Sequence, residues 1–233
     1  MTRLLCWNIR HGGGSRTEAI AAAISAYDPD IVVMPEFRHN LSGQHLHAHL
    51  ADIGLHYHRS GHASAPTNTL SIASRASMAP LPRRGQLGDW GHRVVAARCG
   101  DIRILGLYLP HLKAKRPLVE YLTSLPRAYL REPTLMVGDL NSGKQGIDGP
   151  ETFVFFESGF LDALESQGWT DGFRHFHGMA QEFTWYSHRN NGYRLDHVFS
   201  SPPMTARLRR TWYSHDEREA GLSDHSVLIA DFD

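Results

Sequence analysis

The sequence predicts an α/β fold in which two mixed β-sheets pack face to face and helices cover the outside, a four-layer sandwich. Strand–helix–strand patterns occur twice, from WNIR to MPEF and from LYLP to VGDLN, and patterns of antiparallel hairpins fill the rest of the chain. A mixed order of this kind favours paired sheets with outer helices. The 233 residues contain no linker-like or low-complexity stretch, so we expect a single domain over residues 1–233.

The first third of the chain alternates short apolar runs with helical patterns. A helix is predicted over residues 17–27 after a glycine-rich turn, with Ser15 as its cap and Glu18 three residues on. Asp28-Pro29-Asp30 ends this helix, and a weaker helix is predicted over residues 44–53. We expect strands over residues 3–8, 31–34, 57–60 and 69–74.

The rest of the chain is predicted in the same way. Two strands, 94–99 and 102–108, form a hairpin around Gly100-Asp101, and a helix over residues 117–130 has proline in its first turn. A buried strand over 134–137 ends at Gly138-Asp139. We expect two further helices over 151–158 and 161–167, and strands over 183–187, 195–200, 206–214 and 226–232.

Composition excludes several classes of protein. Twenty-four basic residues balance 24 acidic ones, which argues against a strongly basic nucleic-acid coat and against an acidic solvating tail. Two distant cysteines, Cys6 and Cys99, predict neither a disulfide framework nor a cysteine zinc site. Apolar runs are too short for a membrane span, and the first residues do not resemble a signal peptide. We therefore expect a cytoplasmic protein without membrane partners, and the sequence gives no sign of an obligate dimer, so we expect a monomer.

Polar or ionisable side chains stand at the ends of the predicted strands. If these strands belong to paired sheets, their ends meet at one rim that holds four carboxylates. Such carboxylates repel each other and need a compensating positive charge. Oxygen ligands of this kind suit Mg²⁺ or Mn²⁺. The residues concerned are Asn8, Glu36, Tyr108, Asp139, Asn141, Asp196, Asp224 and His225.

Six motifs resemble those of the endonuclease/exonuclease/phosphatase superfamily and occur in that superfamily's order between residues 4 and 232. They are Asn8 in WNI, Glu36 before a helix, Tyr108 in YLP, GDLN at 138–141, RLDH at 194–197 and SDH at 223–225. The resemblance implies metal-assisted phosphodiester hydrolysis. It implies that Glu36 ligates Mg²⁺ (or Mn²⁺) directly, with Asn8 and Asp224 in or near its coordination shell.

The same resemblance assigns the remaining catalytic roles. Asp139 is expected to orient and deprotonate the attacking water, with Asn141 hydrogen-bonded beside it. Asp196 is expected to hold His225 against the scissile phosphate, and Tyr108 to donate a hydrogen bond to the phosphate or to Asp139. His197, one position after Asp196, is expected to point to the opposite face of the sheet and to serve in packing or at the surface.

Within the superfamily, the segment FTWYSHRNNGYRLDHVFSSP and the upstream DGFR look most like the exonuclease III type of apurinic/apyrimidinic (AP) endonuclease. The resemblance implies that Trp185, Tyr193 and Leu195 line a pocket for a flipped-out baseless sugar, whereas the simpler interpretation is that they pack between strands. Arg174 is a candidate for binding a flanking phosphate. His111 stands where the family commonly has a phosphate-contacting asparagine, and Pro35 where it commonly has glutamine.

The predicted function is therefore a DNA nuclease that leaves a 3′-hydroxyl and a 5′-phosphate, with damaged or 3′-end duplex DNA as its partner. Two alternatives stay open at this point. One is hydrolysis of another phosphoester by the same fold, such as RNA, a nucleotide, an inositol phosphate or a phospholipid head group. The other is a non-catalytic nucleic-acid-binding module, which would be expected to have lost some of the residues named above.

Overall fold

The computed structural model describes residues 1–82 and 87–233, and its framework consists of two six-stranded sheets and one small two-stranded sheet. In spatial order, the first sheet contains β13 (Leu208–Ser214), β14 (Val227–Phe232), β1 (Thr2–Cys6), β2 (Ile31–Phe37), β4 (Thr69–Ser74) and β3 (Tyr57–Ser60). The second contains β5 (Met78–Pro80), β6 (Val94–Cys99), β7 (Ile102–Tyr108), β8 (Thr134–Asp139), β12 (Asp196–Ser200) and β9 (Thr170–Asp171). The small sheet pairs β10 (Trp185–Tyr186) with β11 (Gly192–Tyr193).

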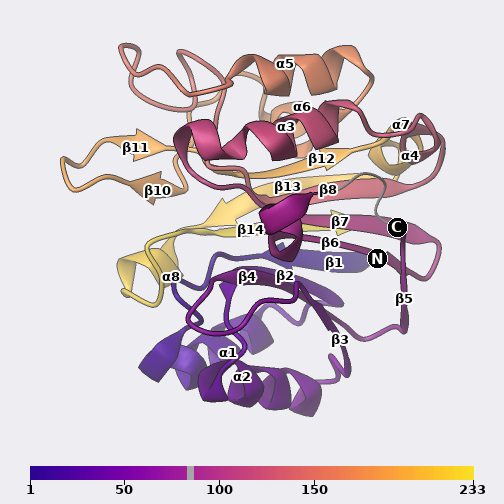
Figure 1. The fold of residues 1–233 in the computed structure, drawn as a ribbon, viewed down its shortest axis with the longest axis vertical. Coiled ribbons are helices and arrows are strands. Elements are labelled where there is room, and N and C mark those ends of the chain that lie inside the picture. The colour runs from indigo at the N-terminus through magenta and orange to yellow at the C-terminus, as the bar shows by residue number, and fades with distance from the viewer. Residues whose placement is uncertain (83–86) are drawn as a thin grey trace.

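Helices lie on the two outer faces of this pair of sheets (Figure 1). The α-helices are α1 (Thr17–Ala26), α2 (Leu41–Asp52), α3 (Arg116–Thr123), α4 (Ala128–Arg131), α5 (Gly159–Ser166), α6 (Gly172–His177), α7 (Pro202–Thr205) and α8 (Asp216–Glu219). Three short 3₁₀ turns are η1 (Gly14–Arg16), η2 (Gly88–Arg93) and η3 (Leu112–Lys115). Helices α1 and α2 cover the first sheet, and α3 and α5 cover the second, so the predicted four-layer α/β sandwich is confirmed.

Both sheets are mixed, as predicted. Strands β1 and β2 are parallel and are connected through α1, while β7 and β8 are parallel and are connected through α3 and α4. The other neighbouring pairs are antiparallel, including the hairpin of β6 and β7. Because parallel strands end at the same edge of a sheet, this topology brings residues that follow β1, β2, β7 and β8 to one side of the molecule.

Three apolar clusters hold the layers together. The central one lies between the two sheets and includes fully buried Leu4 and Ile72 from the first sheet and Ile104 and Leu135 from the second. The other two lie between each sheet and its helices. Burial of this kind stabilises a fold by about 25 cal/mol per Å² of apolar surface removed from water, so the sandwich is a rigid support for side chains at its edge.

The predicted helix over residues 117–130 is divided into two. Helix α3 ends at Thr123, and α4 begins at Ala128. Pro126 lies in the gap, and proline can neither donate a backbone hydrogen bond nor fit the interior of a helix without a clash. The apolar periodicity continues across the break because Leu118, Leu122 and Tyr129 all face the same cluster.

The predicted helix over residues 151–158 is absent, and these residues form turns. Two phenylalanines decide this. Phe153 and Phe155 both make edge-on contacts with the ring of Tyr193, at centroid distances of 4.8 and 6.0 Å. Tertiary packing of these rings therefore overrides the weak helical pattern of the segment.

The expected cap of the first helix is also different. Ser15 lies inside η1, and α1 begins after Arg16 without a side-chain cap. Thr17 instead donates its hydroxyl to the carbonyl of Gly14, at 2.7 Å. Helix α2 starts earlier than predicted because the Asn40 side chain accepts from the amide of Gly43. Six short strands and α-helices of the described residues were not predicted, namely β5, α6, β9, β11, α7 and α8.

Among the described residues, no helix has the combination of length and apolar character that a membrane-crossing segment requires.

Candidate active site

Three predicted site residues lie in one row across the second sheet. Tyr108 at the end of β7 is in register with Asp139 at the end of β8, and Asp139 is in register with Asp196 at the start of β12. Strand β12, which begins at Asp196, is antiparallel to β8, so the beginning of β12 lies beside the ends of β7 and β8. All three side chains are buried. The strand ends therefore converge as the sequence predicted.

The close approach of β7 and β8 depends on Gly138. Its φ is 155°, and a Cβ atom at this position would lie 1.8 Å from the carbonyl oxygen of Leu107. Only glycine avoids that collision. The glycine of the GDLN motif therefore lets Asp139 sit directly beside Tyr108.

Glu36 reaches the site from the first sheet through a β-bulge. The pairing of β2 with β4 shifts between Pro35 and Phe37, and Glu36 between them has a φ of 63°. Bulges redirect a side chain near active sites, and a left-handed non-glycine residue stores local strain. The bulge turns the Glu36 carboxylate toward the row of Tyr108 and Asp139.

The Glu36 carboxylate is surrounded by neutral hydrogen-bond donors. Its Oε1 accepts from the Tyr108 hydroxyl at 3.2 Å and from the Asn8 amide at 3.3 Å. Its Oε2 accepts from the Asn68 amide and from the backbone amide of His11, both at 2.8 Å. These donors fix the carboxylate in position. Burial, followed by the nearby charges of Glu36 and Asp139, raises the pKa of Tyr108 to about 12, so this hydroxyl stays a donor.

Asn8 connects the two sheets. Its amide nitrogen, besides contacting Glu36, donates to Asp139 Oδ2 at 2.9 Å, and the side chain is 1% exposed. Its backbone carbonyl accepts from the Ser223 hydroxyl, which also accepts from the backbone amide of His225. Asn8 and the SDH motif are therefore held by the same contacts, although 215 residues separate Asn8 from Ser223.

His225 lies between two aspartates. Its Nδ1 contacts Asp196 Oδ2 at 2.8 Å, and its Nε2 lies 3.9 Å from Asp139 Oδ2. Although burial lowers the pKa of His225, Asp196 and Asp139 outweigh it and raise this pKa to about 10. The imidazole is therefore a cation at neutral pH, with Asp196 on one side and Asp139 on the other.

The pKa of Asp139 is raised as well. Burial is the largest cause and Asp196 adds to it, and together they raise the pKa of Asp139 to about 7, against the lowering effects of His225, Asn141 and Asn8. A carboxylate with a pKa near neutrality can accept a proton during a reaction and release it afterwards. The row therefore contains a base and, beside it, a buried cation.

Asn141 holds Asp139 through a hydrogen bond, and Lys115 in turn holds Asn141. The backbone amide of Asn141 donates to Asp139 Oδ1 at 2.8 Å, and its side-chain amide donates to the carbonyl of Leu109 at 2.8 Å. The buried Lys115 ammonium donates to the carbonyl of Asn141. Burial, partly offset by Asp139 and then Glu157, lowers the pKa of Lys115 to about 8.

Asp224 and Trp185 meet at the rim. The Trp185 indole donates to Asp224 Oδ2 at 3.2 Å, and Trp185 forms a bridge with His225 along the backbone. Trp185 packs against a cluster of Phe155, Tyr193 and Leu195, in which Tyr193 and Leu195 are each 8% exposed. The three predicted pocket residues are therefore neighbours in one cluster beside Asp224.

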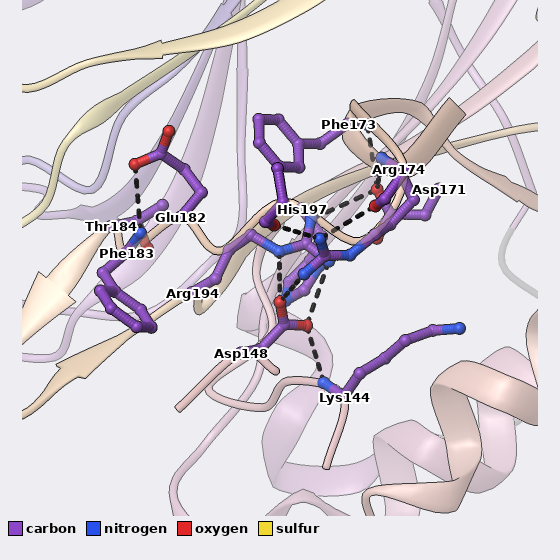
Figure 2. A network of polar contacts seen from close by, with 12 residues as sticks. Lys144, Asp148, Asp171, Phe173, Arg174, Glu182, Phe183, Thr184, Arg194 and His197 are labelled. Carbon is purple, nitrogen blue, oxygen red and sulfur yellow. Dashed lines mark hydrogen bonds and ion pairs between the residues drawn. The ribbon is translucent and has the colours of Figure 1, made fainter. Parts of the chain in front are cut away.

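Arg174 lies in a different environment from the one expected. Its guanidinium bonds Asp148 and the carbonyls of Gly178 and Ala180, so it does not extend toward a flanking phosphate. Figure 2 shows that it joins a buried network around Arg194. Arg194 bonds Asp148 and Asp171 at 2.6 to 3.2 Å, and it is fully buried. The Arg174 side chain therefore forms structural contacts within the protein.

The Arg194 network positions Asp196. Arg194 precedes Leu195 and Asp196 in the chain, and the hydroxyl of Tyr213 donates to the carbonyl of Asp196 at 2.7 Å. His197 is fully buried, with its Nε2 2.8 Å from the carbonyl of Ser142. Its side chain lies in the Arg194 network, where its Nδ1 is 3.7 Å from Asp171 Oδ2 (Figure 2). It is a packing histidine, one of the two roles expected.

His111 stays near the rim without a hydrogen bond to the carboxylates. Desolvation lowers its pKa, and the charges of Lys115 and Arg93 act in the same direction. It is therefore a neutral imidazole near the site.

Sequence reasoning missed Asn68 and Lys115. Asn68 holds both Glu36 and Arg38, whose Nε donates to its side-chain oxygen at 2.6 Å. Asn68 stands in an irregular segment before β4, and Lys115 ends the short 3₁₀ turn η3, so no apolar periodicity marks either position. A single asparagine or lysine in such a segment carries no local signal.

The residues of the rim fit a hard divalent cation. Ligand atoms of Asp139, Asp196 and His225 lie within 4.8 Å of one another, but His225 already neutralises this group from within. Glu36 contacts Asn8, Tyr108 and Asn68, which are neutral donors. An oxygen-rich group of this kind, with amide and carboxylate neighbours, is the donor set that Mg²⁺ and Mn²⁺ prefer.

Similarity to solved structures is high in fold and low in sequence. A 3′ phosphatase from Neisseria bound to a product DNA hairpin matches with a TM-score of 0.86 and 23% identity, covering 100% of both chains. An AP endonuclease from Archaeoglobus fulgidus and a 3′–5′ exonuclease from Neisseria meningitidis each match with a TM-score of 0.84 and 22% identity, again over 100% of both chains. These likenesses establish the fold.

Curated relatives match over a part of the chain. Exodeoxyribonucleases from two strains of Streptococcus pneumoniae are 27% identical over 132 residues, which cover 49% of this chain and 45% of each relative. The match thus spans less than half of the relatives' length. The profile of the Endonuclease/Exonuclease/phosphatase family matches residues 5–225, a range that includes every catalytic and metal-binding candidate named above. On that match, the chain belongs to the endonuclease/exonuclease/phosphatase family.

Proposed function

We propose that this protein is a divalent-metal-dependent phosphodiester hydrolase that acts on DNA in the manner of exonuclease III and AP endonucleases, and that it leaves a 3′-hydroxyl and a 5′-phosphate. The observation that carries the proposal is the contact of His225 with Asp196 and Asp139, next to the Glu36 carboxylate. This group combines a base, a buried cation and hydrogen-bond donors, which in-line attack of water on a phosphate requires.

Asp139 acts as the base in this proposal. It takes a proton from the water that attacks phosphorus, and a pKa of about 7 suits this exchange near neutral pH. Asn141 and Asn8 hold its two oxygens through bonds of 2.8 and 2.9 Å, so the carboxylate is oriented before the substrate arrives.

His225 stabilises the phosphate. It is a cation held by Asp196, and its Nε2 proton is available to a non-bridging phosphate oxygen. Tyr108 lies on the strand that flanks Asp139 on the side away from Asp196, and its hydroxyl would donate a hydrogen bond to the phosphate from that side. Glu36, with Asn8 and Asp224 beside it, would hold Mg²⁺ or Mn²⁺. When bound, such an ion neutralises charge on the phosphate and the leaving oxygen.

The aromatic cluster favours a second candidate within the same chemistry, namely reaction at DNA 3′ ends rather than at internal abasic sites. A preformed pocket for a baseless sugar needs room, whereas Tyr193 and Leu195 are 8% exposed and packed against Phe155. The fold neighbours include a 3′ phosphatase and a 3′–5′ exonuclease, which supports this candidate.

The test is cleavage of a labelled duplex with one abasic-site analogue, beside an undamaged duplex, a duplex with a 3′-phosphate, a single strand and a generic phosphomonoester. Each reaction is run with Mg²⁺, with Mn²⁺ and with a chelator. Incision only at the abasic site supports the AP endonuclease, and trimming of 3′ ends supports the second candidate. No cleavage of any DNA, or full activity with the chelator, refutes the proposed function.

A further inference from the structure

His11 lies beside the Glu36 carboxylate, and none of the proposed steps uses its side chain. Its Nδ1 is 3.2 Å from Glu36 Oε2, and its backbone amide donates to the same oxygen at 2.8 Å. The imidazole is 63% exposed, whereas the Glu36 side chain is 14% exposed. Binding residues are often found on loops that a rigid scaffold positions in this way. His11 is therefore accessible to a ligand that also reaches Glu36.

The turn that carries His11 has an unusual backbone. Five consecutive residues, from Arg10 to Gly14, have φ angles between 49° and 77°. This left-handed region is unfavourable for Arg10 and His11, which are not glycines. Arg16 holds the turn by donating to the carbonyl of Arg10 at 2.7 Å, and the Arg10 amide donates to the Asn8 side chain at 3.0 Å. Strain of this kind is often kept where the backbone has to aim a side chain at a functional site.

Two acceptor atoms, Glu36 Oε2 and His11 Nδ1, converge on the same donor. The side-chain amide nitrogen of Asn68 lies 2.8 Å from Oε2 and 3.2 Å from Nδ1. Arg38 Nη2 lies 3.1 Å from Nδ1, and a guanidinium can only donate. Nδ1 therefore presents its lone pair to these donors. A lone pair directed into the space beside a carboxylate oxygen is also available to a cation.

The distance between the two acceptors is that of neighbouring metal ligands. In an octahedral site with bonds of about 2.1 Å, adjacent ligand atoms lie about 3 Å apart. Oε2 and Nδ1 are 3.2 Å apart. Asn68 and Arg38 bond each other at 2.6 Å, so these two donors retain a partner when a cation takes their place. A carboxylate together with an imidazole favours a first-row transition metal, whereas Mg²⁺ prefers oxygen ligands alone.

Three other histidines show what a structural imidazole looks like in this protein. The Nε2 atoms of His39, His58 and His197 each lie 2.7 to 2.8 Å from a backbone carbonyl. Such a contact fixes the ring within the fold. His11 differs from these three because it is exposed and its Nδ1 lies beside a carboxylate of the candidate site.

We propose that His11 Nδ1 is a further ligand of the divalent cation that Glu36 binds, and that this nitrogen makes the site favour Mn²⁺ over Mg²⁺. The inference rests on the metal-binding part of the proposed function and deepens it, because it names the ion that the site prefers. His11 stands outside the six motifs described above. The competing explanation is that His11 only accepts hydrogen bonds from Arg38 and Asn68 and so anchors the turn.

The experiment compares the wild type with His11→Gln, which keeps a hydrogen-bond acceptor and removes the imidazole nitrogen. His45→Gln is the matched control, because His45 is exposed on α2. Mn²⁺ is bound to each protein without DNA and studied by pulsed electron paramagnetic resonance, which detects the ¹⁴N nucleus of a directly bound imidazole. Glu36→Gln identifies the signal of this site, and His225→Asn removes the imidazole that lies between Asp196 and Asp139.

We expect the ¹⁴N signal in the wild type, in His45→Gln and in His225→Asn, and its loss in His11→Gln. In calorimetric titrations, His11→Gln should weaken Mn²⁺ binding about tenfold, as disturbing a metal site usually does. Mg²⁺ binding should change less than about twofold, because Mg²⁺ gains little from a nitrogen ligand. A ¹⁴N signal that persists in His11→Gln, or an equal loss of affinity for the two ions, would overturn the inference in favour of the anchoring role.

The same samples separate this inference from the proposed function. If Mn²⁺ binding depends on Glu36 and shows the nitrogen of His11, while no DNA is cleaved, the inference stands and only the DNA function is refuted. If DNA is cleaved in Mn²⁺ and the bound ion shows no nitrogen of His11, the inference is overturned and the function stands. Mn²⁺ binding that is unchanged in Glu36→Gln refutes both the metal site at Glu36 and the inference.

Discussion

Replacing Asp139 by asparagine is expected to abolish the activity and to make the protein more stable at alkaline pH. Asparagine mimics the protonated carboxyl, which the buried site favours. A rise of the pKa of Asp139 from 3.8 to about 7 means that ionising it in the folded protein costs up to about 4 kcal/mol, at about 1.4 kcal/mol for each pKa unit. The activity should fall at least about 100-fold, because the base is lost.

The expected gain in the free energy of unfolding is smaller than this upper limit of about 4 kcal/mol. Asp139 Oδ2 accepts from both Asn8 and Asn141, and an amide nitrogen in its place would face two donors. Such a mismatch costs about 1 to 2 kcal/mol. We therefore expect Asp139→Asn to raise the free energy of unfolding by about 2 to 3 kcal/mol at pH 8, which for a chain of this size raises the Tm by about 5 to 10 °C.

The sign of the effect depends on pH. Because the pKa of Asp139 is higher in the folded than in the unfolded protein, the folded state binds the extra proton. The wild type therefore loses stability as pH rises from 3.8 to about 7, and the full penalty is present above that pH. The advantage of the variant should vanish near about pH 5, where the penalty on the wild type equals the cost of the mismatch, and should reach its maximum above about pH 7.

The assay is urea unfolding between pH 4.5 and 8.5 in a chelator, together with cleavage of the labelled duplex in Mg²⁺. Asp101→Asn is the matched control, because the Asp101 side chain is 71% exposed and pairs with Arg207 at the surface. It should change neither quantity. The reasoning is refuted if Asp139→Asn is no more stable than the wild type at pH 8, or if its advantage does not depend on pH.

The other predictions concern Glu36 and His225, the buried network around Arg194, and the acid-sensitive His47. Glu36→Gln and His225→Asn should each lower kcat at least about 100-fold in the duplex assay, and a tenfold loss or less would contradict their roles. Arg194→Met removes the guanidinium that bonds both Asp148 and Asp171, leaves Asp148 with Arg174 as its remaining ion pair, and should destabilise the fold by about 3 to 5 kcal/mol in urea. The network lowers the pKa of both aspartates, so this loss should shrink below about pH 4, and a loss that is equal at all pH values would contradict it. Burial lowers the pKa of His47, which stacks on Phe37, to about 3, so the wild type should lose up to about 1.4 kcal/mol per pH unit below pH 6. In His47→Gln this part of the acid sensitivity should be absent from thermal unfolding curves.

The position of the site was predictable because strand ends can be read from the sequence. Asn8, Tyr108 and Asp139 each follow an apolar run, and parallel strands place such residues at one edge. Asp196 could be added because it begins an antiparallel strand. The register that puts it opposite Asp139 is a property of the paired backbones and became visible only in the structure.

Arg174 shows the limit of motif reading. The DGFR motif indicated a surface arginine beside a phosphate, yet three-dimensional packing gives the guanidinium a carboxylate partner 26 residues earlier in the chain. The choice between an external phosphate and an internal aspartate depends on which acceptor lies within reach. Sequence spacing does not contain that information.

The sequence by itself determined the four-layer class and most of the strands along the chain, and it singled out the candidate site residues, because apolar periodicity and strand-end residues are local properties. Only the tertiary structure decided the protonation and charge of the side chains at the site. The burial of Asp139 and the cation at His225 arise from neighbours that are distant in the chain. Charge and proton affinity depend on the surroundings of a group in space, and folding sets those surroundings.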